Sequence, residues 1–480
     1  MIPGITITNA MMDLWNVENG RPLWASDISA TEFIDWLRAT PVDGMTWMPR
    51  YMQIAYVDSP ELQKKFPEVA YGEVGQFGWW AQTIGRSQSA LIRLFGHRIS
   101  TERTVREGGR IDGGVDVVGF LHAEHGIGQA ARLVVEALRA VQTQVSTTSY
   151  RNTPSRQSYP FHSEEVGTYK TVIMAVNAEI NKDIRNTFGD YFFSNTYVIG
   201  QWFWELEKAP EWYAGSYQYV DELWAPTRFI EEMLKREVPK GVAVQYMPLP
   251  LKVPQVNTTV TRSELGIDNR FMYLFTFDFM SVMKRKNPLG LVEAFRSTFT
   301  DGEGPQLVIK CINGKSRPEG IAQLLQACAG RSDITVIDKY LDADHAAALM
   351  NLCDCYVSLH RSEGLGLTIA DAMLLEKPVI ATGYSGNLDF MTPETSYLVP
   401  WKKVKVGRGA EGYNRSAHWA EPDLLEAGNL MREVFENRVA AHQKGVAAKR
   451  DLVLRFSLNA TGTRMSERLQ EIWDSRKNDA

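Results

Sequence analysis

From residue 115 onward the chain alternates short apolar runs with helix-patterned segments, and this alternation limits the fold more than any other feature. The runs VDVVGFL (115–121), FMYLFTF (271–277) and QLVIKCI (306–312) have the length of strands. Segments such as AARLVVEALRA (130–140) carry apolar residues at helical spacing. Apolar strands that alternate with helices build parallel sheets covered on both faces. The sequence therefore predicts an α/β protein.

The expected strands fall into two blocks. A linker rich in proline and polar residues, PLPLKVPQVNTTVTRSE, separates them. Further strands are expected at 171–177, 197–204, 222–227 and 242–249 in the first block, and at 334–338, 354–360 and 377–383 in the second. A chain of 480 residues is too long for one hydrophobic core. We predict two Rossmann-like domains, 106–255 and 256–430, that face a cleft, and C-terminal helices at 431–480 that pack back across them.

The first 105 residues differ from the rest because they show no run of strands alternating with helices. Short helical patterns such as SATEFIDWLRAT (29–40) are broken by Pro41, Pro49, Pro60 and Pro67. We predict a helical N-terminal extension, residues 1–105, with six tryptophans as packing anchors: Trp15, Trp24, Trp36, Trp47, Trp79 and Trp80. The sequence assigns no function to it; acceptor binding and oligomerisation are both open.

Charge and composition exclude several classes of function. The formal charge of −5 offers no basic field for a phosphate backbone, so we expect no nucleic-acid partner. No apolar run reaches the length needed to cross a bilayer, and the N-terminus does not resemble a signal peptide. The four cysteines show neither CxxC pairs nor histidines at zinc-finger spacing. A cytoplasmic protein without a cofactor is expected.

The segment FDFMSVMKRKNPLGLVEAF places cations between a strand and a helix. Lys284, Arg285 and Lys286 lie in an expected loop, Asn287 suits the helix N-cap and Pro288 the first helical position. A helix N-terminus already favours anions, so cations beside it are unfavourable unless an anion binds there. A bound diphosphate would resolve the conflict. The alternative is a solvated basic loop.

The segment LHRSEGLGLTIADAMLLEKPVIATG combines acids with glycines. Glu363 precedes Gly364, Leu365 and Gly366, and a helix is expected from about residue 367, with Asp371 in its first turns. Glycines at a strand-to-helix turn let a phosphate or sugar approach the backbone. The two carboxylates are suited to bind sugar and ribose hydroxyls. Alone, Asp371 would be explained by the helix dipole.

These two segments resemble the retaining glycosyltransferases of family four, which have the GT-B fold. The family signature places two acids eight residues apart in the context EGFGLxxxEAM, and this chain reads EGLGLTIADAM, with Asp371 as the second acid. The resemblance implies that Glu363 contacts the donor sugar, Asp371 the ribose, and Lys286 the diphosphate. Ser281 replaces the family's companion arginine, and Arg285 is the candidate substitute. Asn387, in YSGNLDFM (384–391), falls where the family has a turn near the donor.

The resemblance covers residues 270–400 strongly and 115–250 moderately, and it does not extend to residues 1–105. It implies that 256–430 bind the donor and 106–255 the acceptor. The expected reaction is hexose transfer with retention from GDP-mannose or a UDP-sugar to a hydroxyl of a glycan or lipid-linked glycan, in bacterial surface polysaccharide synthesis. The expected location is the cytoplasm or the inner face of the cytoplasmic membrane, with peripheral contact to the membrane.

A third segment, GFLHAEHGIGQAAR (119–132), opens a rival hypothesis. Gly126, Gly128 and Ala131 match the GxGxxA fingerprint of nicotinamide dehydrogenases. The acid that such a site needs about 20 residues further on is missing, because the sequence there reads TQVSTTSYRN. By the family resemblance this loop faces the cleft, with Gly128 near the donor diphosphate or the acceptor. His122, Glu124 and His125 are acceptor-side candidates, with surface or capping roles as the alternative.

Two other segments carry acids. WFWELEKAPEWY (202–213) offers Glu205 as a candidate acid beside the acceptor, while core packing is favoured for Trp202 and Trp204. Asp342 and Asp344 form a DxD pattern, but they start an expected helix, where acids need no metal. We therefore expect no metal site. A catalytically silent nucleotide-sugar-binding protein remains the other open class, and a GT-B epimerase or phosphorylase would share the architecture.

Overall fold

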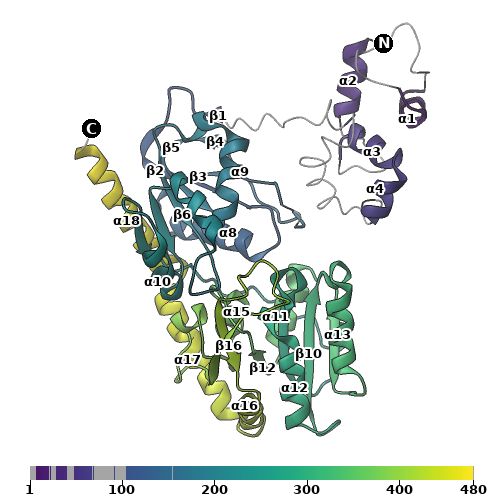
Figure 1. Ribbon diagram of the computed structural model, residues 1–480, viewed down its shortest axis with the longest axis vertical. Helices are drawn as coiled ribbons and strands as arrows, with labels where there is room; N and C mark the ends of the chain where they lie inside the picture. The colour runs from purple at the N-terminus through teal and green to yellow at the C-terminus, as the bar shows by residue number, and fades with distance from the viewer. Residues whose placement is uncertain are drawn as a thin grey trace.

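The computed structural model describes residues 7–20, 22, 29–39, 48–67, 69, 91, 104–153 and 155–478 (Figure 1). Before residue 104 these include helices α1 (Asn9–Asn19), α2 (Ala30–Arg38), α3 (Arg50–Val57) and α4 (Pro60–Lys65). Trp15 is 1% exposed and packs edge-on against Trp36, with ring centroids 5.0 Å apart. Both serve as packing anchors, as expected. The other four tryptophans of this region lie outside the described residues.

The first large sheet is six-stranded and parallel. Its order is β3-β2-β5-β6-β7-β8. The strands are β2 (Ile111–Gly119), β3 (Gln144–Ser149), β5 (Tyr169–Ala175), β6 (Tyr197–Gln201), β7 (Glu222–Ala225) and β8 (Ala243–Tyr246), and their helices are α8 (Gly126–Ala140), α9 (Ala178–Phe188) and α10 (Arg228–Glu237). A small parallel pair, β1 (Thr104–Val105) and β4 (Val166–Gly167), lies beside it.

The second large sheet is also six-stranded and parallel, with the order β11-β10-β9-β12-β13-β14. Its strands are β9 (Phe271–Asp278), β10 (Pro305–Ile312), β11 (Ile334–Asp338), β12 (Cys355–Ser358), β13 (Val379–Thr382) and β14 (Tyr397–Val399). Its helices are α11 (Met283–Lys286), α12 (Pro288–Thr298), α13 (Pro318–Cys328), α14 (Ala343–Leu352) and α15 (Leu367–Leu374). An antiparallel ribbon, β15 (Trp401–Lys405) and β16 (His418–Pro422), follows it.

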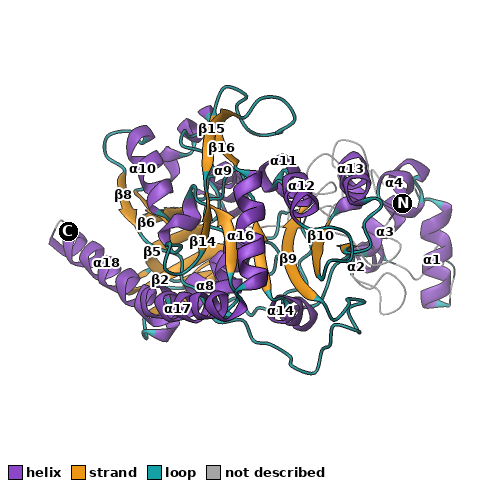
Figure 2. Cartoon of the chain, turned by 90° about the horizontal axis from the view of Figure 1, so that it is seen from below, coloured by secondary structure: helices purple, strands orange, loops and turns teal. Residues whose placement is uncertain are grey.

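Helices lie on both sides of the strands, as Figure 2 shows. Short 3-10 turns span Asp190–Phe193, Glu211–Gly215, Tyr217–Tyr219, Phe279–Ser281, Gly314–Ser316 and Gly386–Asp389. The order of the second sheet reverses between β9 and β12, and that of the first between β2 and β5. In open parallel sheets, ligands bind beyond the carboxyl ends of the strands at such reversal points. The fold thus marks the loops after β9 and β12 as the place to look for a site.

The last helices connect the two sheets. They are α16 (Leu424–Glu436), α17 (Arg438–Phe456) and α18 (Leu458–Asn478). α17 packs on α15, whereas α18 packs on α8 of the first sheet and runs along its side in Figure 1. Arg468 of α18 binds the fully buried Glu222 of β7 through two nitrogens, at 2.7 and 3.0 Å. The chain therefore crosses between the domains a second time, close to Ser457.

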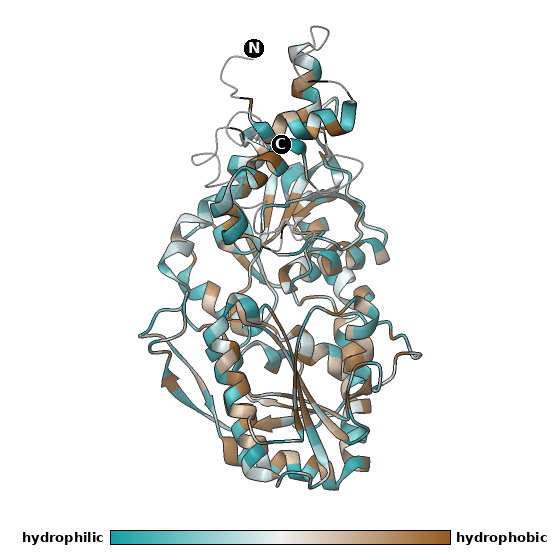
Figure 3. Ribbon diagram, turned by 90° about the vertical axis from the view of Figure 1, so that its right-hand side faces the viewer, coloured by the Kyte–Doolittle hydropathy of each residue, from teal (hydrophilic) through white to brown (hydrophobic). Residues whose placement is uncertain are grey.

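The core follows the apolar runs of the sequence. Apolar strands lie inside and mixed helix faces lie outside (Figure 3). All four cysteines are free and buried: Cys311, Cys328, Cys353 and Cys355. Within the described residues, no helix combines the length and the apolar character needed to cross a membrane.

The α/β fold with two Rossmann-like domains is confirmed, and every strand expected in the two blocks is present. One detail was wrong. Residues 284–286, expected in a loop, belong to the one-turn helix α11. Asn287 is the N-cap of α12 as expected, since its side chain accepts the Gly290 N–H. The sequence did not predict β14 or the β15–β16 ribbon.

Candidate active site

The loops that follow β9 and β12 are tied together at the reversal point of the second sheet. The Asn287 side chain donates to the Leu359 carbonyl at 2.8 Å. The Arg361 backbone N–H donates to the Arg285 carbonyl at 2.7 Å, and its guanidinium donates to the Lys284 carbonyl at 2.6 Å. The two segments that the sequence singled out are therefore neighbours in space.

An ion cluster forms where these loops meet. Lys286 Nζ lies 2.5 Å from Glu363 Oε1, and Arg285 Nη1 lies 3.2 Å from Glu363 Oε2. Arg285 also donates to the Ser362 carbonyl at 2.9 Å and is 4% exposed, so it is enclosed by its partners. The Lys286 side chain retains 16% exposure. Lys286 is thus the cation of the pair that solvent, or a ligand, reaches more readily.

The Glu363 carboxyl of the central pair is ionised at neutral pH. Burial would raise the pKa of Glu363, but Lys286 and Arg285 outweigh it and lower that pKa to about 2. Burial lowers the pKa of Lys286, and the Glu363 carboxylate opposes that shift. An ammonium has three N–H donors. Among the described residues Lys286 donates one hydrogen bond, to Glu363, which leaves donors for an incoming anion.

The backbone around Glu363 is held by the turn that follows β13. The Glu363 N–H donates to Ser385 Oγ at 2.8 Å, and the Gly386 N–H donates to the Glu363 carbonyl at 3.0 Å. A Cβ on Gly386 would lie 2.0 Å from the Gly364 carbonyl oxygen, so only glycine fits there. Gly366 has φ +95°, which also favours glycine. Leu365, between the two glycines, is 6% exposed.

Asn387 supports this turn from inside. It is fully buried, and its side-chain amide donates to the Thr382 carbonyl at 3.0 Å. Its Oδ1 lies 3.1 Å from Nε2 of His360, which is also fully buried. Burial lowers the pKa of His360 to about 4, so this histidine is neutral at pH 7. Asn387 and His360 therefore support the segments around Glu363 from the protein interior.

Asp371 lies in α15, on the helix that starts after Gly366. Burial raises the pKa of this carboxyl to about 7. Its carboxylate makes no hydrogen bond or ion pair with any residue that the structure describes. Ser281 ends the 3-10 turn after β9, and Val282 beyond it has φ 62°.

The first domain contributes Glu205 to the same cluster. Glu205 Oε1 lies 3.6 Å from Arg285 Nη2, and Glu205 Oε2 accepts the Tyr413 hydroxyl at 2.9 Å. Ser362 Oγ donates to the Glu205 carbonyl, and Thr227 Oγ1 donates to the Gly364 carbonyl at 3.1 Å. Glu205 thus lies at the seam of the two domains, beside the loop that carries Glu363. Trp202 and Trp204 are buried at 0% and 9% exposure, as core packing predicted.

The candidates in the loop after β2 have structural partners. His125 caps α8, since its Nδ1 accepts the Gly128 N–H at 3.1 Å, and burial lowers its pKa to about 4. A Cβ on Gly128 would lie 2.5 Å from the Ala123 carbonyl oxygen. The glycine at 128 is therefore explained by close packing of α8 on this loop.

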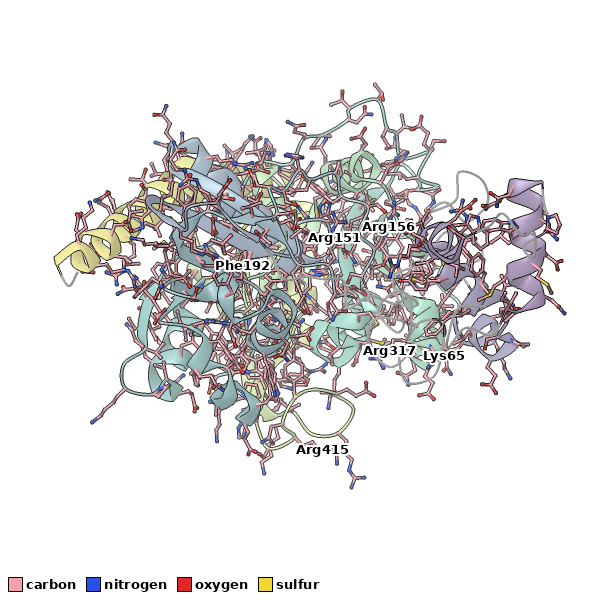
Figure 4. The ribbon with its side chains drawn as sticks, turned by 90° about the horizontal axis from the view of Figure 1, so that it is seen from above. Lys65, Arg151, Arg156, Phe192, Arg317 and Arg415 are labelled. Atoms are coloured by element: carbon pink, nitrogen blue, oxygen red, sulfur yellow. The ribbon has the colours of Figure 1, made fainter. Side chains whose placement is uncertain are left out.

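His122 and Glu124 face the connection that follows β3. His122 Nε2 lies 2.8 Å from Arg151 Nη2, and Glu124 Oε1 lies 3.3 Å from Arg156 Nε. Figure 4 labels both arginines, near the centre of the view. His122 is half-buried, and its Nδ1 lies 3.2 Å from the Tyr159 carbonyl oxygen. Unlike His125, it caps no helix that the structure describes.

Three contacts at the site were not predicted from the sequence. Ser385 and His360 flank the Glu363 backbone, and Tyr413 binds Glu205 from the loop 406–417 that joins β15 to β16. Lys284, grouped in sequence with the other two cations, instead donates to the Val406 and Arg408 carbonyls of this loop at 2.7 and 2.9 Å. His360, three residues before Glu363, and Ser385, inside the 384–391 segment, each carried a signal in the sequence, whereas Tyr413 carried none.

The DxD acids have a local role. Asp342 caps α14 by accepting the His345 N–H at 2.8 Å, and Asp344 lies in the first turn. In the described part of the chain, no three His, Cys, Asp or Glu side chains are grouped as a metal ion would require.

Comparisons with known proteins agree with this geometry. Residues 275–406 match the family model described as glycosyl transferases group 1. No curated protein has significant sequence similarity to the chain. A sucrose-phosphate synthase from Thermosynechococcus elongatus superposes with a TM-score of 0.56 at 15% identity, covering 75% of this chain and 99% of that one. HepE from Anabaena, solved with UDP-glucose, gives 0.54 at 12% identity, covering 75% and 99%. A glycosyltransferase from Rickettsia africae gives 0.52 at 15% identity, covering 75% and 98%.

The paired parallel sheets and these structural neighbours define the class: the protein has the GT-B fold of glycosyltransferases. Within it, residues 275–406 of the second domain match the model of group 1 glycosyl transferases, and the matched segment contains Arg285, Lys286, Glu363 and Asp371.

Proposed function

We propose that the protein is a retaining, metal-independent glycosyltransferase that moves a hexose from a nucleoside diphosphate sugar to a hydroxyl of a glycan or lipid-linked glycan. The observation that carries the proposal is the meeting of Lys286 and Glu363, 2.5 Å apart, at the reversal point of the second sheet. UDP-sugars are favoured by HepE, whose structure holds UDP-glucose. GDP-mannose, which would make the enzyme a mannosyltransferase, is the other donor to test.

The chemistry requires stabilisation of the leaving group. As the bond between the anomeric carbon and the diphosphate oxygen breaks, negative charge grows on the diphosphate. The acceptor oxygen bonds to the same carbon, and its hydroxyl proton passes to the departing diphosphate. Fixed cations and N–H dipoles stabilise such charge without reorganising. In this proposal Lys286 binds the diphosphate through its remaining donors, and the backbone of 364–366 lies against the donor.

Arg285 has a positioning role in the proposal. It is enclosed by Glu363, Glu205 and the Ser362 carbonyl, so it fixes the two acids rather than meeting the diphosphate directly. Glu363, held in its ionised form, accepts hydroxyls of the donor sugar. Asp371, whose carboxylate is not bonded to any other described residue, accepts the ribose hydroxyls. The residue-by-residue roles of Glu363, Asp371 and Lys286 rest on the family resemblance.

The acceptor side is assigned to the first domain. Glu205 and His122 are the candidate acceptor contacts there, because Glu205 reaches the cluster and His122 is only half-buried in the loop after β2. A lipid-linked acceptor would place the enzyme against the inner face of the cytoplasmic membrane. Synthesis of a bacterial surface polysaccharide is the process that such an acceptor implies.

The proposal is tested in two steps. A thermal-shift panel of nucleoside diphosphates and their sugars identifies the donor, since a tight ligand raises the apparent stability by mass action. Release of nucleoside diphosphate from that donor, with NMR of the product, then reports transfer and anomeric configuration, in the presence and absence of a chelator.

Transfer with retention that persists in chelator is the expected outcome. Donor binding without release or transfer would instead favour a silent binding protein. A nicotinamide absorbance change would favour the dehydrogenase.

A further inference from the structure

A cavity of about 960 Å³ lies at the seam of the two domains, beside the turn that holds Glu363. The first domain contributes α10 and the end of β8 to it, and the second contributes the 384–389 turn and Trp401, with residues from the end of α17 and from α18. Its volume is in the range of small-molecule sites. None of Lys286, Glu363 and Asp371 lines it.

One part of the cavity lining is a row of aromatic rings. Trp401 and Tyr384 have ring centroids 4.6 Å apart, and Tyr384 and Phe229 have centroids 5.7 Å apart. The Trp401 indole N–H donates to the Gly383 carbonyl at 2.6 Å, and the Tyr384 hydroxyl donates to Glu207 at 3.1 Å. Trp401 is nevertheless 38% exposed. The rings are fixed in place while the indole stays accessible, which suits stacking against the apolar face of a sugar ring.

The charged lining favours an anion. Four arginines and three carboxylates line the cavity. Glu207 is already bound by Lys403 at 2.6 Å, and Asp389 accepts the Arg228 backbone N–H at 3.0 Å. Arg464, in contrast, makes no hydrogen bond or ion pair with any residue that the structure describes. Arginine forms strong, directional hydrogen bonds with carboxylates and phosphates.

We propose that this cavity is an accessory binding site for a saccharide that carries an acidic group. The sugar ring stacks on Trp401, which the buried Tyr384 ring backs, and its carboxylate or phosphate binds Arg464. The site shares one turn with the donor site, because Ser385 lines the cavity and also accepts the Glu363 N–H. Because the cavity is separate from the donor site, ligand binding to it can be measured directly, without a transfer reaction.

The experiment measures binding of glucuronic acid, glucose 1-phosphate and glucose to the full chain by isothermal titration. The two acidic sugars are expected to bind at least about tenfold more tightly than glucose, the size of one charge-assisted hydrogen bond. Trp401→Ala and Arg464→Gln are each expected to weaken glucuronic acid binding by about tenfold or more. Their matched controls, Tyr191→Ala on an exposed aromatic ring and Arg450→Gln on an exposed arginine of α17, are expected to leave it unchanged.

Lys286→Ala separates this site from the donor site. Glucuronic acid binding is expected to survive that substitution, even though transfer from the donor is slowed about 100-fold or more. Binding that Lys286→Ala removes and Arg464→Gln leaves intact would overturn the proposal, as would the absence of any binding. Equal affinity for glucose and glucuronic acid would overturn the acidic specificity. Arg464 is an exposed residue of α18, so its variant keeps the test valid even where Trp401→Ala fails to fold.

Discussion

Replacement of Lys286 by alanine tests the central assignment most directly. The ammonium is the more exposed cation of the cluster and has donors left after its 2.5 Å bond to Glu363. Loss of one preorganised group that stabilises charge in a transition state costs about 3–4 kcal/mol. Turnover should therefore fall about 100- to 1,000-fold. Because the leaving-group charge grows in the transition state, kcat should fall more than KM rises.

The same variant should still fold. Glu363 keeps Arg285 at 3.2 Å, so its charge is not left alone in the interior. The expected loss of stability is that of one charge-assisted hydrogen bond, about 1.5–3 kcal/mol. This is less than the ~3–5 kcal/mol that follows when a buried ion loses its partner outright.

The assay is steady-state transfer at saturating donor, paired with urea denaturation of the same sample. Lys182→Ala, on the exposed side of α9, is the control and should behave as wild type in both measurements. A tenfold change in rate corresponds to about 1.36 kcal/mol, so a threefold change corresponds to less than about 1 kcal/mol. Turnover of Lys286→Ala within about threefold of wild type would therefore refute the argument.

Three further predictions concern other described contacts. Asp371→Asn should raise the Tm at pH 8 but not below pH 4. Burial raises the pKa of Asp371 to about 7, so the wild-type protein loses the stability of the protonated form as pH rises through 7, whereas the neutral amide does not. Equal Tm values at pH 8 would contradict this. Tyr413→Phe, which removes the hydroxyl bonded to Glu205, should cost about 0.5–1.5 kcal/mol in urea unfolding and speed proteolysis of loop 406–417. Arg468→Ala should cost about 3 kcal/mol, because the fully buried Glu222 loses its cation, and a cost below about 1 kcal/mol would refute that reading.

Local pattern was enough to predict most of the fold. Strands such as β9 and β10 are continuous apolar runs, and Asn287 with Pro288 marks the start of α12 without knowledge of the rest of the chain. β14 has three residues, and β15 is a largely exposed strand rich in lysine. β14 (Tyr397–Val399) is apolar but too short for a periodic pattern, and β15 has no apolar pattern of its own. Their pairing depends on partners supplied by the tertiary structure, which periodicity does not report.

The site was predictable only in part, for a related reason. Lys286 and Glu363 were expected together because each follows a strand of one sheet, and the carboxyl ends of parallel strands share an edge. Tyr413 enters from a loop 50 residues after Glu363, with no pattern to announce it. His125 shows the opposite case, in which a residue suggestive of chemistry is a helix cap. The sequence of a glycine-rich loop does not show which of its polar side chains are already hydrogen-bonded to nearby backbone groups.

The loop that carries Glu363 is held by both domains at once. On one side Ser362 Oγ donates to the Glu205 carbonyl, and on the other Thr227 Oγ1 donates to the Gly364 carbonyl, so contacts from the first domain flank Glu363 in the chain. The cations that ionise Glu363 come from the second domain. Neither domain alone therefore supplies the whole environment of this acid. The chain crosses between the domains at the linker after β8 and again near Ser457, so we expect closure of the domains about these crossings to assemble the site. A donor that binds Glu363 in this arrangement stabilises the closed state by the difference between its affinities for the closed and open forms.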